Sequence, residues 1–216
     1  YHIGSRVVAP ESSAIKKSVK LTWSQAAETL LNYTIAYHAL VEEGGIEKKE
    51  TVLVYPPHTG LGQAAMQIAK DCGARVICAM GQDGKATNTV SKLGMMVMAD
   101  PSSATFGSDL LDFTDNAGVD IIFQSTMDDL PASCLGSLGY GARICKTGSQ
   151  QSILTEASNA VVLPPLSSTL GTTPSRIQDM IATVAAKLDS GKYGTFVTET
   201  TPVSDMSTKV QESNKS

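Results

Sequence analysis

The feature that most constrains the fold of this chain is a short apolar run that leads through a glycine-containing turn into a helix. Residues 51–55 (TVLVY) favour a strand, residues 56–62 (PPHTGLG) a turn, and an amphipathic pattern continues to Lys70. A second apolar run, 75–80, starts about 25 residues after the first, which is close to the length of a strand–helix–strand unit. The sheet is therefore predicted to be parallel.

The same alternation of helix and strand patterns extends over most of the chain. Helices are predicted over residues 23–43, 85–93, 106–114, 129–138 and 175–188. Further strands are predicted over residues 95–99, 119–124 and 142–146. Short connections between these elements predict an α/β fold with a doubly wound parallel sheet of the Rossmann type, whose ligand crevice lies at the carboxyl ends of the strands. Residues 161–163 (VVL) fit an edge strand or a core strand equally well.

The chain is predicted to contain one domain with two short ends. Its 216 residues, 42% of them hydrophobic, are enough to bury one full core. Residues 21–204 are predicted to form the Rossmann-type domain. Residues 1–20 contain one short strand pattern and polar irregular chain, and residues 205–216 form a polar tail.

Charge and hydropathy argue against two classes of partner. The formal net charge is −4 and no polybasic run is present, so neither nucleic acid nor a membrane surface is an expected partner. The apolar runs are far shorter than the roughly 20 residues that a membrane span needs. The first residues lack the charged-then-apolar order of a signal peptide, and we expect a cytoplasmic protein.

The cysteines and histidines do not predict a metal site. The chain has four cysteines, Cys72, Cys78, Cys134 and Cys145. They show no CxxC spacing and stand in apolar segments, which predicts buried reduced thiols. The histidines are His2, His38 and His58. They form no pair with zinc-ligand spacing, so no metal is expected.

The turn before the helix is the candidate cofactor site. Such a turn presents backbone N–H groups to a pyrophosphate, and Thr59, Gly60, Leu61 and Gly62 stand at its positions. The prolines just upstream lack an N–H, and Thr59 adds a β-branched side chain where backbone should come close. Alternatively, the glycines only allow a tight connection between strand and helix, since a partial glycine motif is a weak signal.

Lys85 is the first basic residue after the second predicted strand. A ribose 2′-phosphate would therefore have one plausible partner there. The alternative is that Lys85 is a solvated helix residue.

Two blocks of sequence resemble a known family. Residues 34–40 (TIAYHAL) and 60–70 (GLGQAAMQIAK) are similar, in order and spacing, to the enoyl reductase domains of polyketide and fatty acid synthases. In that family, which is of the medium-chain reductase type, a TAYYAL-like helix precedes a GGVGQAAIQLAK-like turn and helix. The similarity extends weakly over residues 22–201 and is most specific to fungal highly reducing polyketide synthases. It implies that residues 1–20 are a remnant of the family's β-rich substrate-binding domain.

The resemblance also identifies departures from the family pattern. The family's first turn glycine falls at Thr59, and a small residue falls at Pro56. The family's lysine proposed as proton donor aligns with Lys85, but its aspartate partner aligns near Ser103. The family's NSL stretch becomes residues 124–126 (QST).

We therefore expect a degenerate, inactive enoyl reductase domain with a scaffold role and no bound cofactor. The resemblance implies a parent polyketide synthase, an acyltransferase, whose other domains would be partners, together with a separate trans-acting enoyl reductase. It also implies a homodimer that pairs through residues 161–163.

The alternative is an active NADPH-dependent enoyl reductase. Lys85 would then be the proton donor, and nicotinamide beside residues 60–62 would deliver hydride to the β-carbon of an enoyl thioester. A quinone-oxidoreductase-like protein is a third interpretation, because it shares the turn.

Overall fold

The computed structural model describes residues 8, 14–80, 90, 96–98, 100–126, 130–146, 160–163 and 174–196. The helical elements are α1 (Trp23–Tyr37), the π-helical η2 (His38–Glu43), α2 (Gly60–Asp71), α4 (Phe106–Phe113), α5 (Ala132–Leu135) and α7 (Pro174–Asp189). The strands are β1 (Thr51–Tyr55), β2 (Arg75–Ala79), β3 (Met96–Met98), β4 (Val119–Gln124), β5 (Leu138–Lys146) and β6 (Ala160–Leu163).

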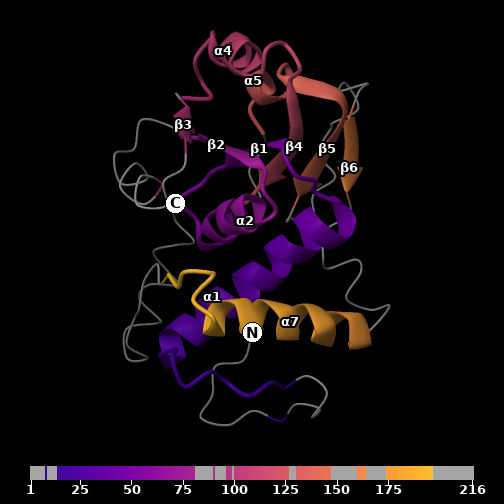
Figure 1. Ribbon diagram of the computed structural model, residues 1–216. Helices are drawn as coiled ribbons and strands as arrows, with labels where there is room; N and C mark the ends of the chain where they lie inside the picture. The colour runs from indigo at the N-terminus through magenta and orange to yellow at the C-terminus, as the bar shows by residue number, and fades with distance from the viewer. Residues whose placement is uncertain are drawn as a thin grey trace.

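The six strands form one parallel sheet in the order β3-β2-β1-β4-β5-β6 (Figure 1). This is the order of the doubly wound dinucleotide-binding fold, in which the chain changes direction across the sheet between the first and fourth strands. The predicted Rossmann-type fold is confirmed. The switch point lies between β1 and β4, whose carboxyl ends meet at the pair Tyr55 and Gln124.

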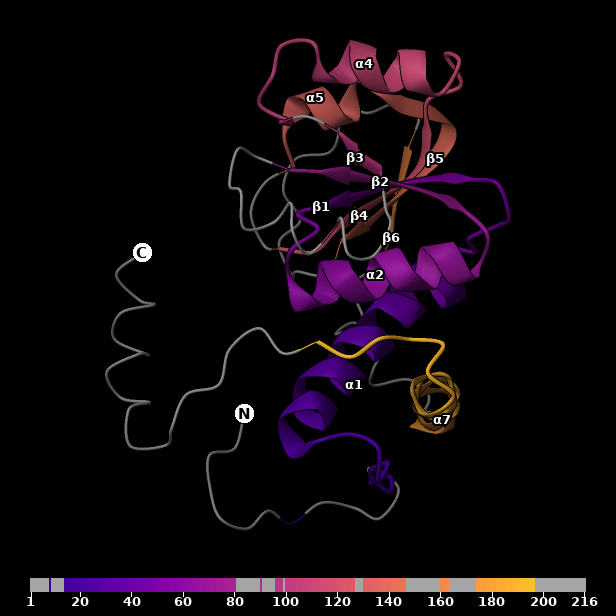
Figure 2. The same ribbon diagram turned by 60° about the vertical axis from the view of Figure 1, so that its left-hand side comes forward.

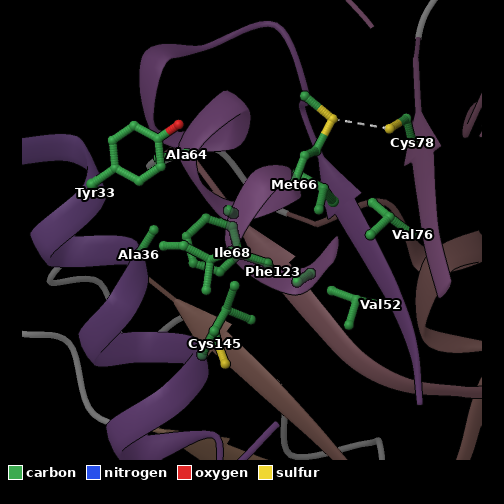
Figure 3. Close-up of a cluster of buried hydrophobic side chains, with 14 of the residues drawn as sticks. Tyr33, Ala36, Val52, Ala64, Met66, Ile68, Val76, Cys78, Phe123 and Cys145 are labelled. Carbon is green, nitrogen blue, oxygen red and sulfur yellow. Dashed lines mark hydrogen bonds between the residues drawn. The ribbon is translucent and has the colours of Figure 1, made fainter. Parts of the chain in front are cut away.

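Helices cover both faces of the sheet. Figure 2 shows α4 and α5 on one face, and α2 on the other with α1 and α7 beyond it. Successive strand residues point to opposite faces, so Leu53 packs toward α4 and Val54 toward α2. The core on the α2 face is drawn in Figure 3, where Met66 of α2 contacts Cys78 of β2. The chain thus buries one core on each side of the sheet.

A capping box begins α1. The Thr22 side chain accepts the Gln25 N–H at 3.2 Å, and the Gln25 side chain accepts the Thr22 N–H at 2.9 Å. The buried face of α1 contains Tyr33 and Ala36. Leu31, on the same helix, is 53% exposed.

Two predicted boundaries also differ from the structure. The helix expected over 23–43 is α-helical only to Tyr37 and continues as the π-helical η2. The helix expected over 129–138 is reduced to α5, which Gly136 ends, and β5 already begins at Leu138. A register shift between β4 and β5 accommodates residues 139–141 (GYG), which lie within β5.

The last described strand, β6, lies at the edge of the sheet. Residues 161–163 belong to β6, which pairs only with β5 among the described strands, so the edge-strand alternative is confirmed. Except for Val90, which is helical and buried, the helix predicted over 85–93 lies outside the described residues. Most of residues 1–20 and the tail 205–216 also lie outside them. None of the described helices combines the length and apolar character required to cross a bilayer.

Candidate dinucleotide-binding turn

The glycine turn lies at the carboxyl end of β1, beside the end of β4. Residues 56–59 connect β1 to Gly60, the first residue of α2. The Ser125 N–H donates to the Tyr55 carbonyl at 2.8 Å, which extends the β1–β4 pairing to the turn. The turn therefore occupies the switch point, where doubly wound sheets bind their ligands.

Thr59 is the N-cap of α2, and its hydroxyl links three parts of the turn. Thr59 Oγ1 accepts the Gly62 N–H at 2.9 Å and donates to Ser125 Oγ at 2.8 Å. Ser125 Oγ in turn donates to the Pro56 carbonyl at 2.5 Å. The backbone of Thr59 is extended, with φ −65° and ψ 156°, as an N-cap requires. One of the N–H groups that a phosphate would use is thereby bound by the protein itself.

Packing constrains both glycines of the turn, and it constrains Gly62 more strictly than Gly60. A Cβ on Gly62 would lie 2.5 Å from the Pro56 carbonyl oxygen and 3.0 Å from backbone atoms of Pro57. A Cβ on Gly60 would lie 2.6 Å from Asn32 Nδ2 of α1. Gly62 therefore permits the tight return of the chain, and Gly60 permits α1 to cross α2 closely. Neither glycine needs a cofactor to explain its presence.

Two donors remain at the start of α2. The N–H groups of Gly60 and Leu61 have no hydrogen-bond partner among the residues that the structure describes. Gly60 is buried and Leu61 is half-buried. The helix end thus keeps part of the positive potential of a helix N-terminus, while the Gly62 donor is occupied.

The other residues singled out from the sequence are separated in the structure. Of the 124–126 stretch, Ser125 lies directly against Thr59. Ser103 precedes α4, where its hydroxyl contacts Thr105 Oγ1 at 3.2 Å. That helix belongs to the layer on the opposite face of the sheet from α2 (Figure 1). Lys85 lies outside the described residues, and its role stays a prediction.

Sequence reasoning missed the side chains that surround Gly60. Asn32, Glu28 and Phe196 all come within 3.2 Å of the position that a Cβ on Gly60 would occupy. The spacing of Glu28 and Asn32 puts them on neighbouring turns of one helix face, but no sequence pattern connects that face with Gly60 or with Phe196.

A segment after α7 fastens α1 to α2 and reaches the turn. Tyr33 Oη of α1 donates to the Gly194 carbonyl at 2.9 Å, and Thr29 Oγ1 donates to the Phe196 carbonyl at 3.1 Å. The Phe196 ring then stacks on Tyr33, with centroids 5.7 Å apart. Residues 193–196, which we call the clasp, therefore place Phe196 beside Gly60.

Comparison with known proteins agrees with this architecture. A protein-family model described as zinc-binding dehydrogenase matches residues 60–186, from the first residue of α2 into α7. The chain belongs to this family. The match includes the glycine turn from Gly60 onward.

Individual relatives of the chain are polyketide synthases. The chain is 33% identical over 125 residues to a subunit of the phenolphthiocerol/phthiocerol polyketide synthase of Mycobacterium tuberculosis, across 58% of this chain. It is 28% identical over 165 residues to the highly reducing polyketide synthase poxF of Penicillium oxalicum, across 72% of this chain. The chain spans only 6% of the length of each of these relatives.

A solved structure of an enoyl reductase domain is also similar to this chain. A putative enoyl reductase domain of polyketide synthase superposes with a TM-score of 0.65 at 28% identity, over 79% of this chain and 99% of that one. The resemblance to polyketide synthase enoyl reductase domains is confirmed.

The zinc in the family's description has no matching donor set in the described part of the chain. No group of three or more His, Cys, Asp or Glu residues that could hold a metal occurs there. Cys78, Cys134 and Cys145 are buried and free, and burial raises the pKa of each thiol to about 12. Zinc binds the thiolate form, which burial disfavours at these three positions. The prediction of buried reduced thiols is confirmed for these three, whereas Cys72 is half-buried.

Proposed function

We propose that this chain is the nucleotide-binding part of a polyketide synthase enoyl reductase domain that has lost dinucleotide binding and serves as a scaffold. The observation that carries the proposal is the Thr59 hydroxyl, which occupies the Gly62 N–H at the start of α2. The family and the relatives support the origin of the domain.

The loss of affinity follows from what a pyrophosphate needs at this turn. It needs free N–H donors at the helix N-terminus and close approach of backbone. Thr59 consumes one donor and adds a side chain held in place by Ser125. A hydrogen bond to a charged group contributes about 1.5–3 kcal/mol, so one lost donor corresponds to roughly 10- to 100-fold in affinity. The residues present do not fit a tightly bound dinucleotide.

The scaffold role rests on what the chain retains. Both faces of the sheet carry packed cores, and the switch-point geometry is intact. The partners that we propose are the other domains of a parent synthase, a separate enoyl reductase that acts in trans, and a second copy of this chain at β6, where Val161 and Val162 are exposed.

An active NADPH-dependent enoyl reductase is the second candidate. The observation in its favour is the position of the turn at the switch point, with the Gly60 and Leu61 N–H groups unpaired within the described residues. Lys85 stays its proposed proton donor.

Titration with NADPH, followed by nicotinamide fluorescence, separates the two candidates. We expect no saturable binding by the unmodified protein up to millimolar NADPH, and no reduction of an enoyl thioester. Thr59→Gly, which frees the Gly62 N–H, should bind measurably. Thr105→Gly is the matched control, because Thr105 is the N-cap of α4 but makes no side-chain cap bond. Saturable binding with turnover by the unmodified protein would contradict the proposal.

A further inference from the structure

A carboxylate lies beside the first residue of α2. Glu28 Oε1 is 3.2 Å from the position of a Cβ on Gly60, which puts it within a few ångström of the start of the helix. It comes from α1, two turns after the capping box at Thr22. No acidic residue stands in the first turn of α2 itself. Glu28 is therefore an acidic group that another element brings to this helix end.

The position has a direct electrostatic consequence. The N-terminus of a helix carries roughly half a positive charge, which normally attracts phosphates. A carboxylate beside it satisfies that potential from within the protein. It also repels a second anion, because two negative charges a few ångström apart in a partly buried site interact unfavourably by more than they would in bulk water.

The turn of α1 that carries Glu28 is held in place at its backbone. Asn32 Nδ2 donates to the Glu28 carbonyl at 3.0 Å and also faces Gly60. One residue along α1, Thr29 Oγ1 donates to the Phe196 carbonyl at 3.1 Å, so the clasp fixes this turn of the helix against α2. The Phe196 ring adds an apolar wall, 3.1 Å from the position of a Cβ on Gly60. A phosphate entering at this helix end would meet the Glu28 carboxylate.

We infer that Glu28 is a specificity residue that excludes phosphoryl anions, free or in a dinucleotide, from the N-terminus of α2. The inference rests on the proposed loss of dinucleotide binding and adds a cause that is independent of Thr59. Thr59 removes a donor, whereas Glu28 opposes the charge of the ligand.

The test is calorimetric titration of the unmodified chain, Glu28→Gln and Glu47→Gln with inorganic pyrophosphate and, separately, with NADPH. Glu47 is an exposed carboxylate that precedes the amino end of β1, whereas the turn follows the carboxyl end of that strand. The Glu47→Gln variant therefore controls for net charge. Glu28→Gln should bind pyrophosphate about tenfold more tightly than the other two proteins at low salt. This gain should shrink toward 1 M salt, where the Debye length is about 3 Å. Circular dichroism and thermal unfolding verify that both variants fold.

Equal pyrophosphate affinity in Glu28→Gln and Glu47→Gln would overturn the inference, and so would the absence of binding by Glu28→Gln up to millimolar pyrophosphate. If Glu28→Gln binds pyrophosphate more tightly but does not bind NADPH more tightly, Glu28 excludes only free anions. That outcome overturns the part of the inference that concerns dinucleotides. The proposed function fails separately, if the unmodified chain binds NADPH saturably and reduces an enoyl thioester.

Discussion

The two ends of α2 are stabilised by different physical means. At the N-terminal end, Thr59 caps the helix with a neutral hydroxyl, and Gly60 lies against side chains of α1 and the clasp. At the C-terminal end, Asp71 binds two cations, Lys187 Nζ at 2.5 Å and Lys192 Nζ. A carboxylate in the last turn of a helix is normally unfavourable, and the two lysines reverse that effect.

One stretch of chain serves both ends. Lys187 is in the last turns of α7, Lys192 and Tyr193 follow it, and Phe196 ends the described part of this stretch beside Gly60. The stretch therefore runs along the whole length of α2. The difference between the ends teaches that ion pairs hold the C-terminal end of α2, whereas a hydroxyl cap and side-chain packing hold its N-terminal end.

The largest effect on stability should come from removing the Tyr193 ring, which belongs to the clasp and contacts both α1 and α2. Tyr193 is 2% exposed, stacks on Tyr33 with centroids 4.7 Å apart, and places its hydroxyl 3.3 Å from Asp71 Oδ2. We expect Tyr193→Ala to lower the free energy of unfolding by about 3–4 kcal/mol, measured by urea denaturation. Tyr140→Ala is the control, because Tyr140 is 98% exposed. Equal losses in the two variants would show that the clasp does not hold α2.

The two glycines of the turn should differ in their tolerance of a methyl group. In Gly62→Ala the new Cβ meets backbone atoms of Pro56 and Pro57, which cannot move cheaply. In Gly60→Ala it meets the ends of the Asn32, Glu28 and Phe196 side chains. We expect losses of about 3 kcal/mol for Gly62→Ala and about 1 kcal/mol for Gly60→Ala in urea unfolding. The reverse order would mean that the helix crossing, and not the chain return, constrains this end.

The charged end of α2 should respond to pH. Burial alone would raise the pKa of Asp71, but hydrogen bonds from Lys187 and Lys192 outweigh it and hold the pKa below its usual value. The ion pairs therefore stabilise the folded state above the unfolded pKa of about 3.9, and this contribution is lost as the pH falls through the lower folded-state pKa.

At pH 7, Asp71→Asn should lower the free energy of unfolding by about 2 kcal/mol, because the lysines are partly exposed and the pairs are weaker than fully buried ones. The difference from the unmodified protein should shrink below about pH 4. Thermal unfolding across this pH range measures it. A difference that does not change with pH would assign the loss to packing.

The smallest effect should come from the neutral cap. Thr59→Ala removes the bond to the Gly62 N–H and should cost about 1 kcal/mol in urea unfolding. Ser125→Ala should cost a similar amount, and the double variant should cost less than the sum, because the two hydroxyls share one hydrogen bond. Strict additivity would show that the Thr59 and Ser125 hydroxyls act separately.

Local patterns were enough to predict most of the architecture. The apolar runs at β1, β2 and β4 and the helix patterns at α2 and α7 predict the observed elements, because the period of buried residues is a local property of helix and strand. The same reasoning was wrong around α5 and the start of β5, where a register shift between strands, and not the local glycines, decides the boundary.

The site was predictable only in part. The place of the turn follows from the strand–turn–helix order, and Thr59 stands out in the sequence as a departure from a glycine. Its bond to Ser125 depends on the pairing of β1 with β4, which brings the two residues together.

The sequence by itself determined the order of strands and helices, the parallel sheet and the position of the turn, because these depend on periodicity and on the handedness of short crossovers. Only the tertiary structure decided that Glu28 and Phe196 meet at Gly60 and that Asp71 meets two lysines. Such contacts join residues far apart along the chain, and they depend on how closely helices cross, which no local pattern encodes.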